Sequence, residues 1–466
     1  MLKSTKTKRK KESNDMTYSI LHFLKKKDPN ITLLTDKEPE EMFINYTPYS
    51  VAEATLSYTP KACEKCGVVN DCGQVEKHGF NKASYVKLGK SFEAFVLLKL
   101  RKQRFKCKEC HRTFIARTPL VDKNCFISNP LKKAIQGELG YTQSMTDISD
   151  RYDISVSSVI RTLDRISYSW TVHKHSLPEI LSFDECMTTE KELSFVYMDA
   201  QKHTLIDILP SRKKEFLRDY FLRFPLEARE NVAAVTMDMY APYETLVPEI
   251  FPNAIVITDR FHIVQHLNVA LNRMRIETMN SLRYEQPRDY KKLKDLWKLV
   301  LKNREELDVD HYKFHPLFTG LMTEKMIVDY LINLSPKLTQ TYDIINDLKF
   351  SVQTMDSNSF FNDIMATRKV TLRRYVRTTL QTFTKREASI RAAMDYSYSN
   401  GALEGMNNKI KNNKRAGYGF SNFRRFKTKV FLTCEFHRIR KERKRRLKEE
   451  RQKRKQQKNQ IRKRAS

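Results

Sequence analysis

The stretch that most constrains the fold runs from Leu181 to Gln201 and indicates two short strands with a tight connection. Within the first strand, Asp184 and Glu185 are neighbours, and successive strand residues face opposite sides of a sheet. Asp184 therefore points a carboxylate to one side of an otherwise apolar strand. A lone charge in such a place is costly unless something neutralises it. We expect a divalent metal ion to do so.

Strands and helices alternate across residues 177–262, which we take as the first part of a catalytic domain. Further strands are expected at 204–210, 232–237 and 254–258, and helices at 212–224 and 243–250. Hairpin-joined strands followed by α/β units predict a mixed sheet with helices on its faces, in the ribonuclease-H-like order. The last two strands each end in an acid, Asp238 and Asp259.

A long helical region follows and then a return to the catalytic domain. Residues 263–395 have helical periodicity with few Gly or Pro, which predicts an all-α insertion with Trp297 in its core. Stacking of Trp297 on a DNA base is the alternative. Residues 396–435 form the expected last part of the catalytic domain, where Asn400 can cap a helix that Gly417 ends. One face of this helix carries four polar residues, and two arginines follow among aromatic residues. They are Glu404, Asn408, Lys411 and Arg415 on the helix, then Arg424 and Arg425. The four cations among them, Lys411, Arg415, Arg424 and Arg425, are candidate DNA-binding residues.

Three of these acids can converge. Asp184, Asp238 and Glu404 offer hard oxygen ligands of the kind that Mg²⁺ prefers. Two such ions, or Mn²⁺ in their place, can activate a water or a 3′-hydroxyl and stabilise the leaving oxygen at phosphorus. Periodicity alone leaves structural alternatives open: Asp238 as a helix cap, Glu404 as a partner of the helix dipole, or Asp184 paired with an arginine.

Two cysteine pairs indicate a zinc-binding module at 61–120. Cys63 and Cys66 form one CxxC pair, and Cys107 and Cys110 form the other. Four thiolates suit tetrahedral zinc in a structural role. The gap of 40 residues between the pairs is long for a zinc ribbon. Unrelated buried cysteines are the alternative, and the nearby substitutes as ligands are Cys72, His78 and His111.

Residues 129–170 predict a helix-turn-helix. Helices are expected at 129–139, 144–152 and 156–167, with Asp153 in the turn, where glycine is common and aspartate is tolerated. The third helix exposes polar groups suited to phosphates and base edges. These candidate DNA-binding residues are Ser155, Ser157, Ser158, Arg161 and Arg165. A plain helical hairpin between domains is the alternative.

The charge of the chain points to a polyanionic partner. Its 466 residues carry a formal net charge of +31, and residues 436–466, the basic tail, hold 16 Lys and Arg against 3 Asp and Glu. Residues 1–60 begin with a basic arm at 1–15. No apolar run approaches a membrane span, no signal peptide is evident, and eight cysteines suit a reducing compartment. We therefore expect a cytoplasmic protein associated with nucleic acid.

Taken together, these motifs resemble bacterial insertion-sequence transposases of the ISL-three type, within the DDE superfamily. The resemblance covers about Cys63 to Phe431. It is most specific in TMDMYAPY at 236–243, TDRFHIVQHLN at 258–268 and SNGALEGMNNKIKNNKRAGYGFSNF at 399–423, with FDE at 183–185. It implies a ribonuclease-H-like domain with a helical insertion, and a DDE triad on Asp184, Asp238 and Glu404.

The same resemblance implies roles for other residues and an activity. Asp259 and His262 match a DxxH motif with a supporting or DNA-contacting role, and Lys411 matches a basic position after the last acid. The implied activity is Mg²⁺-dependent cleavage and transfer of DNA bounded by terminal inverted repeats, by a homodimer acting on those repeats and a target. The alternatives are a DNA-binding regulator that does not use its acids, or a structure-specific nuclease without a joining step.

Overall fold

The computed structural model describes residues 27–34, 40–44, 46–91, 94–169, 174–189 and 193–465, with Ile20, Leu24 and Lys27 in a preceding helix. The basic arm expected at 1–15 lies outside the described residues. Contacts group the chain into two units. Unit 1 comprises residues 1–170 and 413–466, and unit 2 comprises residues 171–412.

A seven-stranded sheet forms the first part of unit 1. Its central strand β6 (Ala94–Cys107) pairs in parallel with β3 (Thr47–Leu56) and antiparallel with β4 (Val75–Phe80), β5 (Ser84–Ser91) and β7 (Thr113–Ile115). Strands β1 (Ile31–Leu33) and β2 (Glu40–Ile44) pair with β3. The boundary expected at residue 60 therefore falls inside one sheet. Local patterns could not reveal this, because the β3–β6 pairing joins residues far apart in the chain.

Three helices follow at the predicted positions: α2 (Asn129–Glu138), α3 (Met145–Tyr152) and α4 (Val156–Ser169). A capping box starts α3, where the Ser144 hydroxyl accepts from the Asp147 N–H at 3.0 Å and the Asp147 carboxylate accepts from the Ser144 N–H at 3.1 Å. Asp153 adopts the predicted left-handed turn, with φ of 45°. Its carboxylate pairs with Lys87 of β5 at 2.8 Å, so the turn is tied to the sheet.

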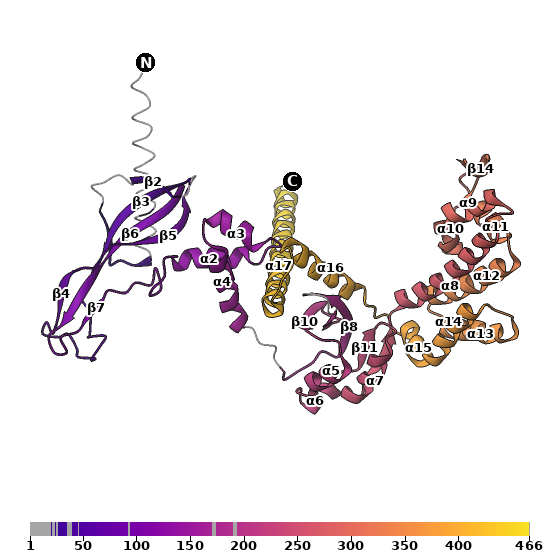
Figure 1. Ribbon diagram of the computed structural model, residues 1–466, viewed down its shortest axis with the longest axis horizontal. Coiled ribbons are helices and arrows are strands. Elements are labelled where there is room, and N and C mark those ends of the chain that lie inside the picture. The colour runs from indigo at the N-terminus through magenta and orange to yellow at the C-terminus, as the bar shows by residue number, and fades with distance from the viewer. Residues whose placement is uncertain are drawn as a thin grey trace, which may run out of the picture. The chain divides into compact units, whose positions relative to one another are not determined.

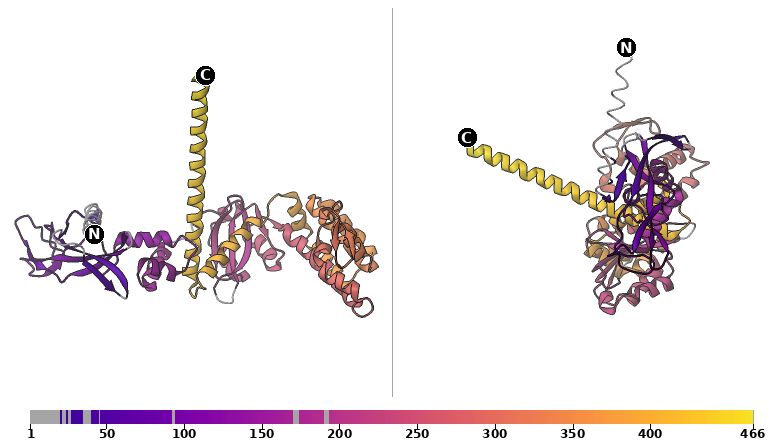
Figure 2. Two further views of the ribbon diagram at one scale, coloured as in Figure 1. Left: turned by 90° about the horizontal axis from the view of Figure 1, so that it is seen from above. Right: turned by 90° about the vertical axis from the view of Figure 1, so that its left-hand side faces the viewer.

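The C-terminal helix α17 (Phe423–Ala465) is continuous (Figure 2) and packs on these three helices. Its Lys429 ammonium is buried and donates to the carbonyl oxygens of Leu139 at 2.9 Å and Tyr141 at 2.7 Å, just beyond α2. Burial lowers the pKa of Lys429 to about 8. Gly140 allows the close approach of Phe436, because a Cβ there would overlap the phenyl ring.

This packing divides the segment expected as the last part of the catalytic domain. Residues 396–412 lie in unit 2, whereas residues 413–435 group with unit 1. The buried side chains of Phe426 and Val430 belong to the apolar face that α17 contributes. Helical periodicity marks such a face but does not say which domain it packs against, and the expected extent of the catalytic domain, residues 396–435, stays a prediction.

A five-stranded sheet organises unit 2, in the order β10-β9-β8-β11-β12. Strands β8 (Ile180–Met187), β9 (Leu193–Asp199) and β10 (Thr204–Leu209) are antiparallel, and β11 (Ala234–Met237) and β12 (Ile255–Thr258) continue from β8 in parallel. Helices α5 (Lys214–Phe221), α6 (Leu226–Glu230) and α7 (Ala241–Ile250) pack on one face around Phe183 (Figure 1). The predicted mixed sheet is confirmed.

The predicted insertion is helical, with one small hairpin. Its helices are α8 (Arg260–Ser281), α9 (Pro287–Asp295), α10 (Trp297–Leu301), α11 (Glu324–Ile332), α12 (Pro336–Gln353), α13 (Ser357–Ala366), α14 (Arg374–Lys385) and α15 (Glu387–Asp395). The hairpin joins β13 (Lys313–His315) and β14 (Gly320–Met322). Trp297 is 40% exposed at the start of α10, so its predicted core position is wrong. Within the described ranges, every helix is too short or too polar to span a bilayer.

Candidate active site

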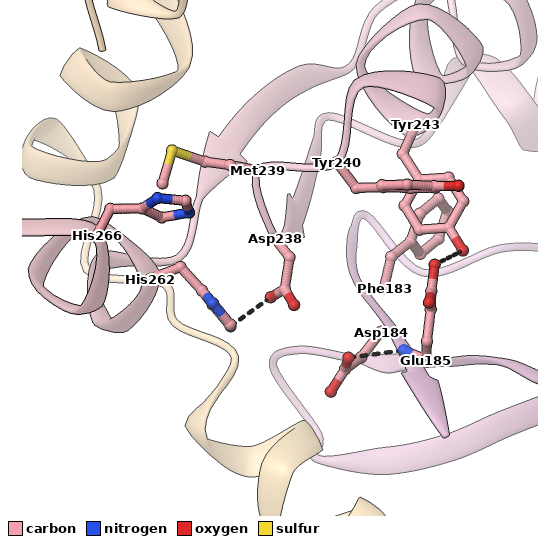
Figure 3. Close-up of a pocket in the computed structure, with 9 residues that line it drawn as sticks. All are labelled: Phe183, Asp184, Glu185, Asp238, Met239, Tyr240, Tyr243, His262 and His266. Carbon is pink, nitrogen blue, oxygen red and sulfur yellow. Dashed lines mark hydrogen bonds and ion pairs between the residues drawn. The ribbon is translucent and has the colours of Figure 1, made fainter. Parts of the chain in front are cut away.

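A pocket of about 250 Å³ lies in the five-stranded sheet where β11 ends beside the middle of β8 (Figure 3). Its walls come from β8, from the loop after β11, and from the first turns of α7 and α8. The lining residues are Phe183, Asp184, Glu185, Asp238, Met239, Tyr240, Tyr243, His262 and His266. The pocket thus brings together two of the three predicted catalytic acids, Asp184 and Asp238.

Asp184 is partly buried, and few donors compensate its charge. Its Oδ1 accepts from the Glu185 N–H at 2.6 Å, and its Oδ2 accepts from the side-chain amide of Asn407. Burial raises the pKa of Asp184 to about 6, and the negative charge of Asp238 acts in the same direction. The carboxylate therefore sits where additional positive charge would be stabilising.

Glu185 points to the other face of the sheet, as the strand alternation predicts. Its carboxylate accepts from the Tyr243 hydroxyl at 2.8 Å and from the Arg212 guanidinium at 2.5 Å. Tyr243 belongs to α7 and Arg212 directly precedes the turn into α5, so both partners lie on the face of the sheet that carries Phe183. Glu185 is thus fully paired by the protein, whereas Asp184 faces the side occupied by a later helix.

Asp238 belongs to a cluster with Asp259 and His262. Their ligand atoms all lie within 4.8 Å of one another, and His262 Nε2 is 2.8 Å from Asp238 Oδ1. The hydrogen bond to Asp238 raises the pKa of His262. Burial raises the pKa of Asp259, whose carboxylate caps α8 through the Phe261 N–H. Of the two strand-end acids, Asp259 is therefore the one that caps a helix, which leaves an oxygen of Asp238 facing the pocket.

Glu404 is exposed in the first turn of α16 (Gly401–Ala416) and is not among the residues that line the pocket. Two buried asparagines fix this helix to the sheet. Asn400 accepts from the Thr236 hydroxyl at 2.6 Å and donates to the Phe183 carbonyl at 3.1 Å. One turn after Glu404, Asn407 donates to Asp184. The helix face that carries Glu404 is therefore anchored beside β8.

From the sequence, Asn400 was predicted only as a helix cap, and Asn407 was not identified as a functional residue. The available signal was their spacing of seven residues, which puts both on the face that carries Glu404. The cationic candidates on α16, Lys411 and Arg415, are exposed.

The candidate DNA-contacting groups of α4 face outward. Of the two candidate arginines of α17, Arg424 is exposed and Arg425 is partly buried, and both contact α4. Ser155, Ser157, Arg161 and Arg165 are exposed and Ser158 is partly so. In contrast, the Arg425 guanidinium makes two hydrogen bonds to the Asp164 carboxylate, at 2.8 and 2.9 Å. Arg424 donates to the Ser167 carbonyl at 3.2 Å. These contacts give Arg424 and Arg425 a role in holding α17 against α4.

The four cysteines of the CxxC pairs come together in unit 1. All four sulfur atoms lie within 4.8 Å of one another, with 3.8 Å between Cys63 and Cys110 and 3.7 Å between Cys66 and Cys107. Against the effect of burial, the N–H groups of Lys65 and Cys66 lower the pKa of the Cys63 thiol to about 7. In the described part of unit 1, the substitutes Cys72, His78 and His111 lie outside this cluster.

Comparisons with known proteins agree with these features. The family model for DDE transposases of the ISL-three type, described as "Transposase", matches residues 181–430. The transposase for insertion sequence element IS1001 from Bordetella parapertussis is 23% identical over 375 residues, covering 79% of this chain and 87% of that protein. A protein named ATP-dependent protease from Lactococcus lactis subsp. lactis is 39% identical over 111 residues, only 24% of this chain and 35% of that protein. The family match spans more than half of the sequence, and the chain therefore belongs to the ISL-three family of DDE transposases.

Proposed function

We propose that this transposase binds the terminal inverted repeats of its own insertion sequence and catalyses Mg²⁺-dependent DNA strand cleavage and strand transfer. The observation that carries the proposal is the meeting of Asp184 and Asp238 in one pocket where β11 ends beside β8. The strand order, three antiparallel strands and then two parallel ones, supports a ribonuclease-H-like assignment.

The residues present suit a divalent cation. Asp184 and Asp238 share the pocket, and burial, with the nearby charge of Asp238, raises the pKa of Asp184. With Glu404 from α16, they would hold two Mg²⁺ ions, or Mn²⁺ in their place. Bound there, the ions would activate a water or a 3′-hydroxyl and stabilise the leaving oxygen.

Neighbouring side chains would keep the acids in place. His262 holds one oxygen of Asp238, and Asn407 holds one oxygen of Asp184. Asp259 fixes the first turn of α8, which carries His262, by accepting from the Phe261 N–H. In this proposal Asp259 and His262 are supporting residues that act through Asp238.

Unit 1 would supply DNA recognition. The exposed serines and arginines of α4 would contact the repeats, as the second helix of a helix-turn-helix does, and Lys411 and Arg415 of α16 would hold phosphates. Zinc would hold the cysteine cluster together. A tetrahedral site with Zn–S bonds of about 2.3 Å has sulfur atoms about 3.8 Å apart. The two sulfur–sulfur distances of 3.8 and 3.7 Å fit this geometry. The expected homodimer stays a prediction.

The test uses the full chain and DNA ends taken from the borders of its own gene. We expect nicks at the repeat ends in the presence of Mg²⁺, and joining of pre-cleaved ends to a target plasmid. Cleavage that is never followed by joining would identify a nuclease instead. Specific binding to the ends with neither reaction would identify a regulator.

Asn407→Ala should slow cleavage without unfolding unit 2. The variant removes the amide that holds Asp184, and partners of metal-binding residues typically contribute about 10- to 100-fold to activity or metal affinity. We expect that loss in the cleavage rate, together with a higher Mg²⁺ concentration at half-maximal rate. Asn280→Ala, on the exposed side of α8 and outside the pocket, is the matched control and should behave as wild type. Equal rates and Mg²⁺ requirements for both variants would rule out the positioning role.

A further inference from the structure

A second strongly basic feature lies in the helical insertion, outside the motifs of the family resemblance. Residues 367–386 carry seven Lys and Arg and no Asp or Glu. This segment forms a short 3₁₀ turn, η2 (Thr367–Lys369), an extended connection, and then α14. Seven like charges within twenty residues repel one another, and this repulsion is relieved only by solvent or by negatively charged groups.

Four of these cations line a pocket of about 790 Å³ between η2 and α14. They are Arg368, Lys369, Arg377 and Lys385, all of them exposed, and no acid lines the pocket. Arg368, Lys369 and Lys385 make no ion pair with any described residue. Threonine and glutamine side chains add hydrogen-bonding groups to the lining, and Ile364, Leu372 and Leu380 form its apolar part. The pocket thus offers positive charge and polar groups to an anionic ligand.

Other cations of the same segment fix the two ends of α14. Arg373 pairs with Glu277 of α8, and Arg386 pairs with Glu244 of α7. These pairs hold α14 against two helices of unit 2. Two of the cations that line the pocket, Arg377 and Lys385, are therefore presented by a fixed helix, and Arg368 and Lys369 lie on the η2 turn opposite it.

The C-terminal end of α14 adjoins the catalytic pocket. The Phe383 ring lies 6.4 Å from the ring of His266, which lines that pocket. Glu244, the partner of Arg386, directly follows Tyr243, which also lines it. The basic pocket extends from this end of α14, at Thr384 and Lys385, towards η2. A strand of DNA leaving the catalytic acids in this direction would therefore meet the basic pocket.

We propose that this basic pocket binds the sugar–phosphate backbone of duplex DNA beside the bond that is cut. The proposal rests on the proposed function and names where its substrate is held. Carboxylates at the catalytic pocket repel a phosphodiester, so cations close by are needed to keep DNA there. Contacts to phosphates of this kind carry no sequence information and depend strongly on salt.

The double variant Arg368→Gln/Lys369→Gln tests the proposal in the full chain. The probe is a short duplex of arbitrary sequence, with binding measured from about 50 to 200 mM salt. Each phosphate contact contributes about 0.9 to the slope of log K against log salt, so losing two contacts should lower its magnitude by about 1.8. Because slopes add over contacts, this loss is measurable on top of the DNA contacts proposed for unit 1.

The matched control is Lys291→Gln/Lys294→Gln, which removes two exposed cations of α9 in the same insertion and outside the pocket. Its slope should equal that of wild type. An unchanged slope for Arg368→Gln/Lys369→Gln, or an equal fall for both double variants, would overturn the proposal. A fall in slope that appears only with single-stranded DNA would mean that the duplex backbone is not the ligand. Inorganic phosphate that displaces the duplex fully at equal phosphate concentration would mean the same. Failure of the proposed function would show differently, as wild-type protein that cuts no DNA.

Discussion

Asp184→Asn should reduce strand cleavage by about 10²–10³-fold or more, because it removes a carboxylate proposed to hold Mg²⁺ and keeps the side-chain volume. Asp184 shares its pocket with Asp238 and is the less compensated of the two carboxylates on β8. The measurement is the single-turnover rate of nicking at a repeat end, at saturating Mg²⁺. Asp219→Asn, the same chemical change on the exposed side of α5, should cut at the wild-type rate.

The same variant should not be less stable in metal-free buffer. Burial raises the folded-state pKa of Asp184 to about 6, above its ordinary value of 3.8. A carboxyl whose pKa is raised by folding stabilises the fold below its unfolded pKa, and this contribution is lost as pH rises through about 6. At pH 7 the ionised Asp184 therefore costs stability, and asparagine avoids this cost. A melting temperature of Asp184→Asn well below wild type would indicate misfolding and void the kinetic result.

Local signals predicted much of this molecule. The turn at Asp153, the helices around it and the strand that carries Asp184 follow from capping, turn chemistry and alternation over a few neighbouring residues. The same is true of the acids at the ends of β11 and β12, since strand ends in an open sheet are where ligands bind. In each case the deciding contacts are close in the sequence.

Contacts between distant segments were less accessible. Asn407 lies 223 residues from Asp184, and an uncharged amide on a helix gives no sign of that partner. The packing of α17 against α4 also joins segments far apart in the chain, and no local pattern indicates it. Arg425 illustrates the difficulty: among aromatic residues it resembles a DNA contact, yet its guanidinium holds Asp164. Trp297 was misjudged because large apolar residues are usually buried, and here the side chain begins a short surface helix.

Cys107→Ser should abolish zinc binding by the cysteine cluster and destabilise the seven-stranded sheet. Cys107 is buried at the end of β6, the strand that pairs with four others, and its sulfur lies 3.7 Å from that of Cys66. Structural zinc sites contribute apparent binding free energies of about 10–16 kcal/mol, and removing one thiolate loses most of this. We expect metal content measured by mass spectrometry to fall from one zinc per chain to nearly none, with unfolding of unit 1 at a much lower temperature.

Cys72→Ser provides the matched control, because Cys72 is an exposed free thiol outside the cluster in the same module. It should keep one zinc and the wild-type melting temperature. A chelator added to wild-type protein should reproduce the effect of Cys107→Ser on unit 1, and it should leave the five-stranded sheet of unit 2 folded, since that sheet contains none of the four cysteines. Full zinc content in Cys107→Ser would mean that the cluster is only a group of packed thiols, and the zinc assignment would then be wrong.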